Sequence, residues 1–363
     1  MSTRRPTISD VARSAGVSKG AVSFALNDRA GVSRETRDRI LATARQLGWQ
    51  PSHRARSLST SRAFTFGLVL ARAPELLGAD PFYPSFIAGV ETILAPAGFS
   101  LVLQVVAGAQ SEADGYRKLA GEGRVDGVFV SDVRTDDSRI ELLSELRLPA
   151  VTLNAPNGIS PFPAVCVDDR CGIRDAVEHL VGLGHTQIAH VSGPLEFLHS
   201  VSRRDAWASV IEEAGLPAGS LVVSDFTAAG GAAATARLLD LAEGPTAIVF
   251  ANDVMAIAGL GVMHHRGLRV PDDMSVTGFD GTELASYVHP PLTTITTNPF
   301  AWGQAAATML LGVIDPGAPT TIANVHLEPG RLEVRGSTAR PPSYHKSAHE
   351  GFEGSVRQRD PDP

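Results

Sequence analysis

The chain has 363 residues, of which 43% are hydrophobic and 20% are charged, and its net charge is −7. This length predicts two or three domains, and the composition excludes a wholly disordered chain, a collagen and a coiled-coil rod. No apolar stretch approaches the roughly 20 residues that a membrane span needs, and no apolar segment follows the basic start at Arg4 and Arg5. We therefore expect no membrane partner and no secretion signal, and a cytoplasmic protein.

The net charge hides an uneven distribution along the chain. Residues 1–62 contain 12 Lys and Arg but only 4 Asp and Glu, a local net charge of +8 that leaves −15 for the other residues. A basic segment on an acidic body is expected of a protein that binds a polyanion. A solvated basic linker is the alternative, but apolar residues recur periodically in this segment and argue against it.

The first fifty residues predict three short helices. Thr7 and Asp10 have the spacing of a capping box, and apolar residues then recur at helical spacing until Gly16. A second helix begins at Ser18, and Ser33 caps a third. Helix, tight turn, helix and supporting helix is the order of a helix-turn-helix unit, although other three-helix bundles share it.

A short basic stretch follows the three helices, PSHRARSLS at residues 51–59. Nine residues are too few to hold a helix alone in water, so we expect this segment to become ordered only against a partner. The alternative is a plain flexible linker.

These segments resemble the DNA-binding head and hinge helix of the LacI/GalR family. The resemblance lies in TISDVARSAGVSKGAVSFALN, GVSRETRDRILATARQLGWQPS and ARSL. It implies that the second helix reads the major groove of a palindromic operator, and that the two hinge helices of a dimer insert Leu58 into the minor groove. The residues that we assign to DNA binding are Thr7, Ile8, Ser18, Lys19, Gly20, Ala21, Ser23, Asn27, Arg54, Ala55 and Leu58. The sequence departs from many relatives at Phe24, where they carry Arg.

From Phe64 onward, short apolar strands alternate with helical segments, which predicts parallel sheets with helices on both faces. The first set of expected strands is Phe66–Leu70, Leu101–Val105, Gly127–Val130 and Ala150–Leu153. The second set is Val165–Val167, Ile188–Val191, Leu221–Val223, Ala247–Phe250 and Ser275–Gly278. Expected helices include Phe86–Leu94, Ile173–Leu183, Ala206–Ala214, Ala232–Leu241 and Val254–His265. Two sets of strands indicate two lobes with a cleft, and ligands of such folds bind beyond the carboxyl ends of the strands.

The expected fold is therefore an α-helical helix-turn-helix head plus a two-lobed α/β core with parallel sheets. We place the head at residues 1–50, the hinge and linker at 51–62, the core at 63–340 and a disordered tail at 341–363. Within the core, we assign one lobe to about 63–162 with 293–325 and the other to about 163–292.

The LacI/GalR resemblance continues through the core, in DPFYPSFIAGVE, HLVGLGHTQIAHVSGP, ANDV, GFDG and PPLTTI. It implies a core similar to periplasmic sugar-binding proteins, in which both lobes hold a small ligand. The residues that match the family's ligand-binding positions are Phe82, Arg203, Phe226, Asn252 and Asp280. Carboxylates, amides and Arg suit hydroxyl groups, and aromatic rings suit the C–H face of a sugar. Purine-binding members carry an Arg and a Trp that are absent here, at Phe197 and Ala155, which favours a saccharide effector.

Each of these five residues has a purely structural alternative. Asp280 then stabilises a turn, Asn252 caps the next helix, Arg203 lies on the surface, and Phe82 and Phe226 belong to the core.

Three other classes of protein fit the sequence less well. An enzyme is disfavoured because no nucleophile elbow, P-loop, HExxH or GxGxxG after a strand is present. A scaffold protein would not require polar residues gathered at strand ends. A solute-binding protein would share the core but not the basic head, and it is the alternative that we keep.

The sequence thus predicts a homodimeric transcriptional repressor whose operator affinity is controlled by a saccharide between the lobes. Cys166 and Cys171 lack metal-ligand spacing, so we expect reduced thiols, no metal and no cofactor.

Overall fold

The computed structural model describes residues 6–26, 30–49, 62–72, 77–78, 80–158, 160–315, 317 and 323–342. The predicted hinge with Arg54, Ala55 and Leu58 lies outside these residues, as do Asn27 and the predicted tail from residue 343 onward.

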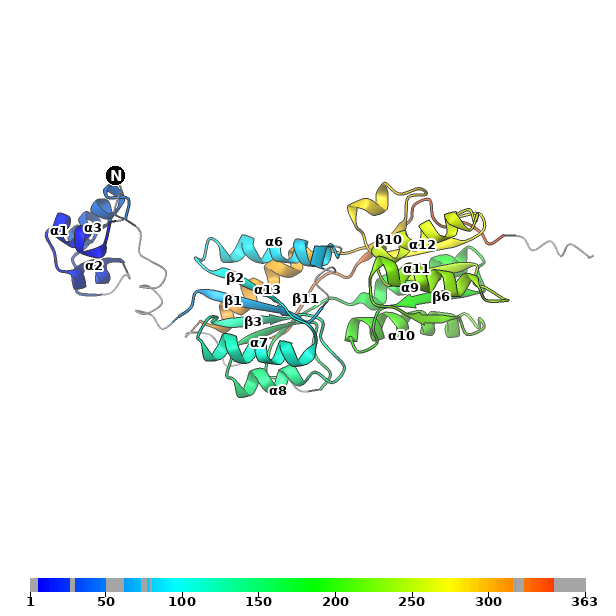
Figure 1. The fold of residues 1–363 in the computed structure, drawn as a ribbon, viewed down its shortest axis with the longest axis horizontal. Helices are drawn as coiled ribbons and strands as arrows, with labels where there is room; N and C mark the ends of the chain where they lie inside the picture. Colours follow the sequence, from blue (N-terminus) through cyan, green and yellow to red (C-terminus); the bar gives the residue numbers. More distant parts are fainter. Residues whose placement is uncertain are drawn as a thin grey trace, which may run out of the picture.

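Three helices form a small N-terminal domain, the head: α1 (Ile8–Ala15), α2 (Lys19–Leu26) and α3 (Arg34–Gln46) (Figure 1). The Thr7 N–H donates to the carboxylate of Asp10 at 2.9 Å, as the predicted capping box requires. Gly16 ends α1 with a φ of 66°, in the left-handed region that favours glycine. The core of the head consists of small and branched apolar residues from all three helices: Val11, Ala12, Ala15, Val22, Ala25, Ile40 and Ala44. The predicted helix-turn-helix arrangement is confirmed.

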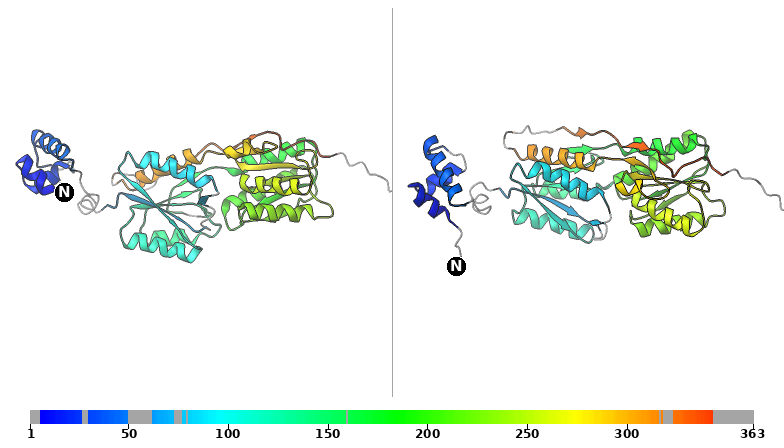
Figure 2. Two further views of the ribbon diagram at one scale, coloured as in Figure 1. Left: turned by 45° about the horizontal axis from the view of Figure 1, so that its top comes forward. Right: turned by 90° about the horizontal axis from the view of Figure 1, so that it is seen from above.

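The first lobe, lobe 1, is built on a six-stranded parallel sheet in the order β11-β5-β4-β3-β1-β2. Its strands are β1 (Thr65–Leu70), β2 (Ser100–Val105), β3 (Gly127–Val130), β4 (Ala150–Leu153), β5 (Ala164–Cys166) and β11 (Val325–His326). Helices α6 (Phe82–Leu94) and α13 (Pro299–Val313) cover one face, and α7 (Ala109–Gly121) and α8 (Ser138–Glu145) cover the other (Figures 1 and 2). Every residue of β3 and β4 is buried, as expected for parallel strands between two helical layers.

The second lobe, lobe 2, repeats this architecture with the order β12-β10-β9-β8-β6-β7. Its strands are β6 (Ile188–Ser192), β7 (Leu221–Val223), β8 (Ala247–Phe250), β9 (Ser275–Asp280), β10 (Thr293–Thr296) and β12 (Arg331–Glu333). β12 pairs antiparallel with β10, and the other pairs are parallel. Helices α9 (Asp169–Gly182) and α10 (Leu198–Glu213) pack on one face, α11 (Ala228–Leu239) and α12 (Asp253–His265) on the other, and a short 3-10 helix (Glu283–Ser286) follows β9.

The predicted lobe boundaries are wrong at two strands. Val165–Val167 was expected in the second set, but β5 pairs with β4 in lobe 1. Residue 293 onward was expected in the first lobe, but β10 pairs with β9 in lobe 2. Alternation of strands and helices predicts the elements, but it does not predict which sheet a strand joins. Next to a crossover between the lobes, only the pairing of a strand with its neighbours decides its sheet.

The chain passes between the lobes at three crossovers within the described residues. They connect β5 to α9, β10 to α13, and β11 to β12. The third is tightly packed, because a Cβ atom on Gly330 would lie 2.6 Å from a methyl carbon of Ile295.

Two glycines allow α6 and α13 to pack backbone against backbone, although the helices lie far apart in the sequence (Figure 2). A Cβ atom on Gly89 would lie 2.0 Å from the Phe300 carbonyl oxygen, and one on Gly303 would lie 2.1 Å from the Phe86 carbonyl oxygen. Lobe 1 is therefore complete only when α13 is in place.

The predicted core helices begin earlier in the structure than the sequence indicated. The largest difference is α10, which starts at Leu198 rather than Ala206. Several helix N-caps lie directly after a strand or after a short loop that follows one. The Asp168 carboxylate accepts the Arg170 N–H at 3.0 Å, and the Thr227 hydroxyl accepts the Gly230 N–H at 2.8 Å. The polar residues at the cleft edge of the sheets thus serve partly as helix caps.

Candidate functional site

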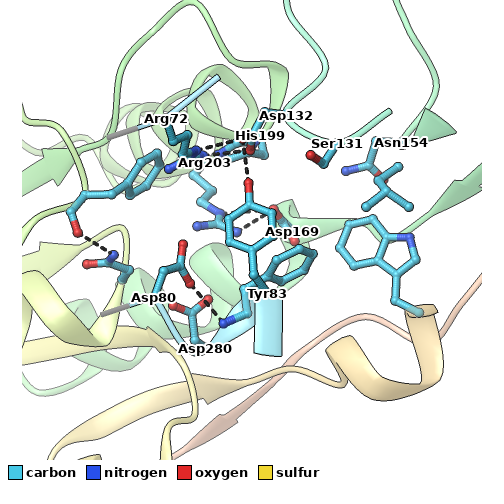
Figure 3. A pocket seen from close by; sticks show the side chains of 15 residues that line it. Arg72, Asp80, Tyr83, Ser131, Asp132, Asn154, Asp169, His199, Arg203 and Asp280 are labelled. Carbon is cyan, nitrogen blue, oxygen red and sulfur yellow. Dashed lines mark hydrogen bonds and ion pairs between the residues drawn. The ribbon is translucent and has the colours of Figure 1, made fainter. Parts of the chain in front are cut away.

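A cavity lies between the two lobes and is lined by residues of both (Figure 3). It contains about 590 Å³ of space free of protein atoms, part of which is open to solvent. Most of its lining residues follow the carboxyl ends of strands or lie in the first turns of the next helices. This is the position at which parallel α/β sheets bind ligands.

Arg203, on α10, is buried in the wall formed by lobe 2. Its Nε and Nη2 donate to Asp169 Oδ2 at 3.0 and 2.9 Å, and its Nη1 donates to the Ala251 carbonyl oxygen at 2.7 Å. The guanidinium carbon lies 3.7 Å from the centre of the Phe279 ring. Asp169 thus neutralises Arg203 and fixes its plane, which rules out the alternative that Arg203 is a surface residue.

Arg72 forms a second ion pair in the wall formed by lobe 1. Its Nε and Nη2 donate to the two carboxylate oxygens of Asp132 at 2.7 and 2.6 Å, and the Tyr83 hydroxyl donates to Asp132 at 2.6 Å. Burial alone would raise the pKa of Asp132, but the guanidinium of Arg72 outweighs burial and holds that pKa below its usual range. Asp132 is therefore charged near pH 7.

Three rings of lobe 2 stack beside Arg72. His199 stacks on both Phe197 and Phe226, with ring centres 5.5 Å apart in each pair. The Arg72 guanidinium lies over the same two phenylalanine rings. Burial, with a contribution from Arg203, lowers the pKa of His199 to about 3, so this imidazole is neutral near pH 7.

Phe226, the predicted aromatic platform for the ligand, is also packed against protein groups. A Cβ atom on Gly193 would lie 1.9 Å from Cζ of Phe226, so the ring rests directly on the glycine backbone. Because His199 and Arg72 also contact this ring, protein groups cover much of its surface. Phe226 therefore lines the cavity and also supports Arg72 and His199.

Among the residues that the structure describes, no Arg forms an ion pair with Asp80 or Asp280, two carboxylates of the cavity that come from opposite lobes. Asp80 accepts the Phe82 N–H at 2.9 Å, whereas no hydrogen bond within the described part of the chain reaches the carboxylate of Asp280. Burial raises the pKa of Asp280 well above its usual range, and Asp253 and Asp80 add to the rise against the attraction of Arg203. Burial also raises the pKa of Asp80. Both carboxyl groups have oxygen atoms that can accept hydrogen bonds from a ligand.

Phe82 and Trp302 form an aromatic wall on the side of lobe 1. Their ring centres lie 5.6 Å apart with the planes at 87°, and Phe82 also stacks on Phe86 at 5.8 Å. The Trp302 indole N–H donates to the Val165 carbonyl oxygen at 2.9 Å, which fixes the indole plane.

Backbone strain is concentrated at the cavity. Six non-glycine residues in the described ranges have a positive φ, and four of them line the cavity: Asp132, Asn154, Phe226 and Asp280. Such conformations cost roughly 1–3 kcal/mol each and cluster where function requires them.

The structure brings all five predicted ligand-binding residues, Phe82, Arg203, Phe226, Asn252 and Asp280, into this one cavity. Asn252 also serves its structural alternative, because its Oδ1 accepts the Met255 N–H at 2.9 Å and caps α12. Its Nδ2 donates to the Phe226 carbonyl oxygen at 3.1 Å and so holds the strained Phe226 backbone.

Sequence reasoning missed several lining residues, most importantly Arg72, Asp80, Asp132, Asp169 and Trp302. Arg72 and Asp132 each stand within two residues of an apolar strand, so the strand-end rule that placed the cleft also applies to them. Asp169 follows β5, and only the fold brings it to Arg203, 34 positions away.

In the head, the predicted DNA-binding residues lie at the start of α1 and along α2. Ser18, Lys19 and Gly20 are exposed, whereas Thr7, Ile8, Ala21 and Ser23 are half-buried. The Ser18 hydroxyl accepts the Ala21 N–H at 3.1 Å and caps α2. Phe24 is 41% exposed, so an apolar ring stands beside these polar residues.

Comparison with known proteins identifies both parts of the chain. The model of bacterial regulatory proteins of the lacI family matches residues 7–52, and a periplasmic binding protein-like domain matches residues 177–338. The HTH-type transcriptional regulator CelR of Thermobifida fusca is 35% identical over 314 residues, which cover 85% of this chain and 92% of CelR. The chain belongs to the LacI family.

Solved structures agree with the assignment of this chain to the LacI family. A CelR–cellobiose complex matches with a TM-score of 0.70 and 32% identity, over 92% of this chain and all of that one. A lac repressor dimer bound to operator and the anti-inducer ONPF matches with a TM-score of 0.79 and 29% identity, over 93% and 100%. The predicted fold and family are confirmed, and the protein is a DNA-binding transcriptional regulator of the ligand-controlled type.

Two further observations concern this LacI-family regulator. No helix in the described ranges is long and apolar enough to cross a membrane. Cys166 is buried and Cys171 is exposed, and both are free thiols as predicted.

Proposed function

We propose that this regulator is a homodimeric repressor in the cytoplasm, with a saccharide effector bound in the cavity between the lobes. The single observation that carries the proposal is the arrangement of Asp280 and Arg203 of lobe 2 opposite the aromatic pair Phe82 and Trp302 of lobe 1. Charged groups on one wall suit the hydroxyl edges of a sugar, and aromatic faces on the other suit its C–H face. The similar CelR structure is a complex with cellobiose, which agrees with this class of ligand.

The connection between head and core supports control of DNA binding by the ligand. Arg62, the residue at which the described core begins, donates from Nη2 to the Ile314 carbonyl oxygen at the end of α13, at 2.8 Å. The segment from the head therefore enters lobe 1 and not lobe 2. A ligand that changes the angle between the lobes moves this entry point in each subunit of a dimer, and its effect equals its differential affinity for the two states.

The cavity gives no support for catalysis. Asp132 and Asp169 are each paired with an arginine, and His199 stacks between aromatic side chains. We propose that these groups hold the walls in place and bind the ligand without chemical conversion.

Operator binding tests the proposal directly. The purified full-length protein is footprinted on the DNA upstream of its own reading frame, at several salt concentrations, with and without a panel of saccharides. We expect protection of a palindrome, a steep fall in affinity with salt, and one saccharide that changes operator affinity. Tight saccharide binding without any footprint would favour the solute-binding alternative.

A Leu58→Ala variant tests the hinge that the sequence predicts. Because Leu58 is expected to insert only into kinked operator DNA, its loss should weaken specific DNA binding much more than non-specific DNA binding. Equal losses on both DNAs would contradict the assignment of the hinge.

A further inference from the structure

An aromatic ring is exposed on the second helix of the head. Among the described residues of the head, Phe24 is the only large apolar side chain that is exposed, and 41% of its surface is open to solvent. It takes no part in the apolar core of the head, to which α2 contributes Val22 and Ala25. The core of the head therefore does not account for an aromatic ring at this position.

The Phe24 ring nevertheless rests against the backbone. A Cβ atom on Gly31, which precedes α3, would lie 3.3 Å from Cδ2 and 3.5 Å from Cε2 of Phe24. Gly31 has a φ of 112°, a conformation that glycine adopts without steric cost. One edge of the ring is thus supported while the rest remains open. A supported ring loses less conformational entropy on binding than a free one does.

The ring belongs to the exposed face of α2. Val22 and Ala25 are buried, whereas Gly20 and Phe24 are exposed and lie one helical turn apart on the same face. A Cβ atom on Gly20 would approach only the Ser18 Oγ, at 3.7 Å, so the backbone is uncovered there. In helix-turn-helix proteins the second helix enters the major groove, where this face would meet the edges of the base pairs.

The chemistry of α2 favours an apolar contact with DNA. The helix has the sequence KGAVSFAL and contains no Arg, Asn or Gln, the side chains that pair bidentately with guanine or adenine. The apolar group that base pairs present in the major groove is the C5-methyl group of thymine, and phenylalanine is among the side chains that contact it. The polar edges of other bases would lose water against the ring without gaining a hydrogen bond.

We propose that Phe24 is a specificity-determining residue that contacts the C5-methyl group of a thymine in each half-site of the operator. Where many relatives carry an arginine, whose guanidinium pairs with guanine, this chain then prefers a T·A pair. The inference rests on DNA binding by this LacI-family regulator and not on its effector or on repression. Its failure would therefore leave the proposed function intact.

The test removes the methyl group from the DNA. The full-length protein first selects its operator from a library of random DNA duplexes. Uracil then replaces the thymines of the selected operator, one position at a time and symmetrically in both half-sites. Uracil lacks only the methyl group, so base pairing and the other groups in the groove are unchanged. Affinity is measured by fluorescence anisotropy at one fixed salt concentration, because salt alone changes it strongly.

Two further duplexes separate the methyl group from the rest of the thymine base. At the position that responds to uracil, they carry cytosine or 5-methylcytosine, each paired with guanine. The methylated base presents the same C5-methyl group in the groove and should bind more tightly than cytosine if that group is recognised.

Three substitutions locate the contact on the protein. Phe24→Ala removes the ring, and Phe24→Arg introduces the side chain that pairs with guanine. Leu41→Ala is the matched control, because it also truncates an apolar side chain of the head, but on α3. The uracil series on the parent protein needs no variant, so the inference stays testable even if Phe24→Ala fails to fold.

We expect one position of each half-site at which uracil weakens binding by the parent about fourfold, as the loss of one buried methyl-sized group should. Phe24→Ala should bind the thymine and uracil operators equally, Leu41→Ala should keep the difference, and Phe24→Arg should prefer a G·C pair there. A parent that binds every uracil operator as tightly as the thymine operator would overturn the inference. So would a Phe24→Ala variant that keeps the full difference.

Discussion

The guanidinium carbon of Arg72 in lobe 1 lies 5.0 Å from the centre of the Phe197 ring in lobe 2. Beside this contact, the Thr135 N–H donates to the Glu196 carbonyl oxygen at 3.0 Å, and the Leu198 N–H donates to the Val133 carbonyl oxygen at 2.9 Å. Side chains and backbone thus join the lobes along one edge of the cavity, and Asp132 holds Arg72 in place for that contact.

Arg72→Ala should lower the free energy of unfolding by about 3 kcal/mol, since it leaves the buried Asp132 carboxylate without its counter-ion. Adding Asp132→Asn should recover part of this loss, because the unpaired charge is then gone. Urea unfolding of the single and double variants measures both effects. A double variant that is no more stable than Arg72→Ala would show that Asp132 is not stabilised mainly by Arg72.

Asp280→Asn should stabilise the protein near pH 7 while abolishing the saccharide response. Burial raises the pKa of Asp280 above its usual value of 3.8, so the folded state binds this proton more tightly than the unfolded state does. The parent's stability from this group is therefore present at low pH and is lost as pH rises from about 3.8 through the raised pKa.

The Asp280→Asn variant does not lose this stability, so its free energy of unfolding should increasingly exceed that of the parent across the same pH interval. The difference should reach roughly 0.5–2 kcal/mol at neutral pH. Thermal unfolding from acidic to neutral pH gives the difference at each step. A variant that is less stable than the parent at pH 7 would contradict the unpaired state of Asp280.

Gly193→Ala should destabilise lobe 2 by roughly 1–3 kcal/mol, as overpacking of a filled site usually does. The new methyl group would meet the ring of Phe226, which then moves away from His199 and Arg72. Phe226→Leu in the same chain frees space and should restore part of the stability. Calorimetric unfolding of the parent, the single and the double variant decides whether the ring rests on the glycine backbone this closely.

Lys19→Gln should weaken operator and non-specific DNA binding to a similar extent, because an exposed lysine at the start of α2 is placed to contact a phosphate. The slope of log affinity against log salt should become shallower by about 0.9 for each phosphate that the variant no longer neutralises. Ser23→Ala serves as the comparison and should change base preference at an unchanged slope. An unaltered slope for Lys19→Gln would show that this residue does not bind a phosphate.

Much of the architecture could be predicted because it is encoded locally. The stretches around Phe66, Val128 and Ile248 are apolar runs bounded by polar residues, and each is a buried strand. The sheets that β5 and β10 join could not be predicted in the same way, since each strand lies next to a crossover between the lobes. Local pattern contains no information about that.

Five lining residues of the candidate cavity could be predicted from the sequence, but most of the others and the contacts among them could not. Asn252 and Asp280 lie at strand ends, where a sequence shows them directly. The partners Arg72 and Asp132 are 60 positions apart, and Arg203 and Asp169 are 34 apart. Nothing in the sequence indicated that Phe226 would rest on Gly193, because that contact requires the turn geometry of two separate loops.

The backbone contact between α6 and α13 has a consequence for how the protein is made. Synthesis proceeds from the N-terminus, and domains generally fold as they emerge. The head has its own apolar core and can fold as soon as residue 49 leaves the ribosome. Lobe 1 cannot complete its packing at that stage, because α6 packs against α13, which begins only at Pro299. A ribosome that stalls in between would therefore carry a DNA-binding unit before the effector-binding core that regulates it has been finished.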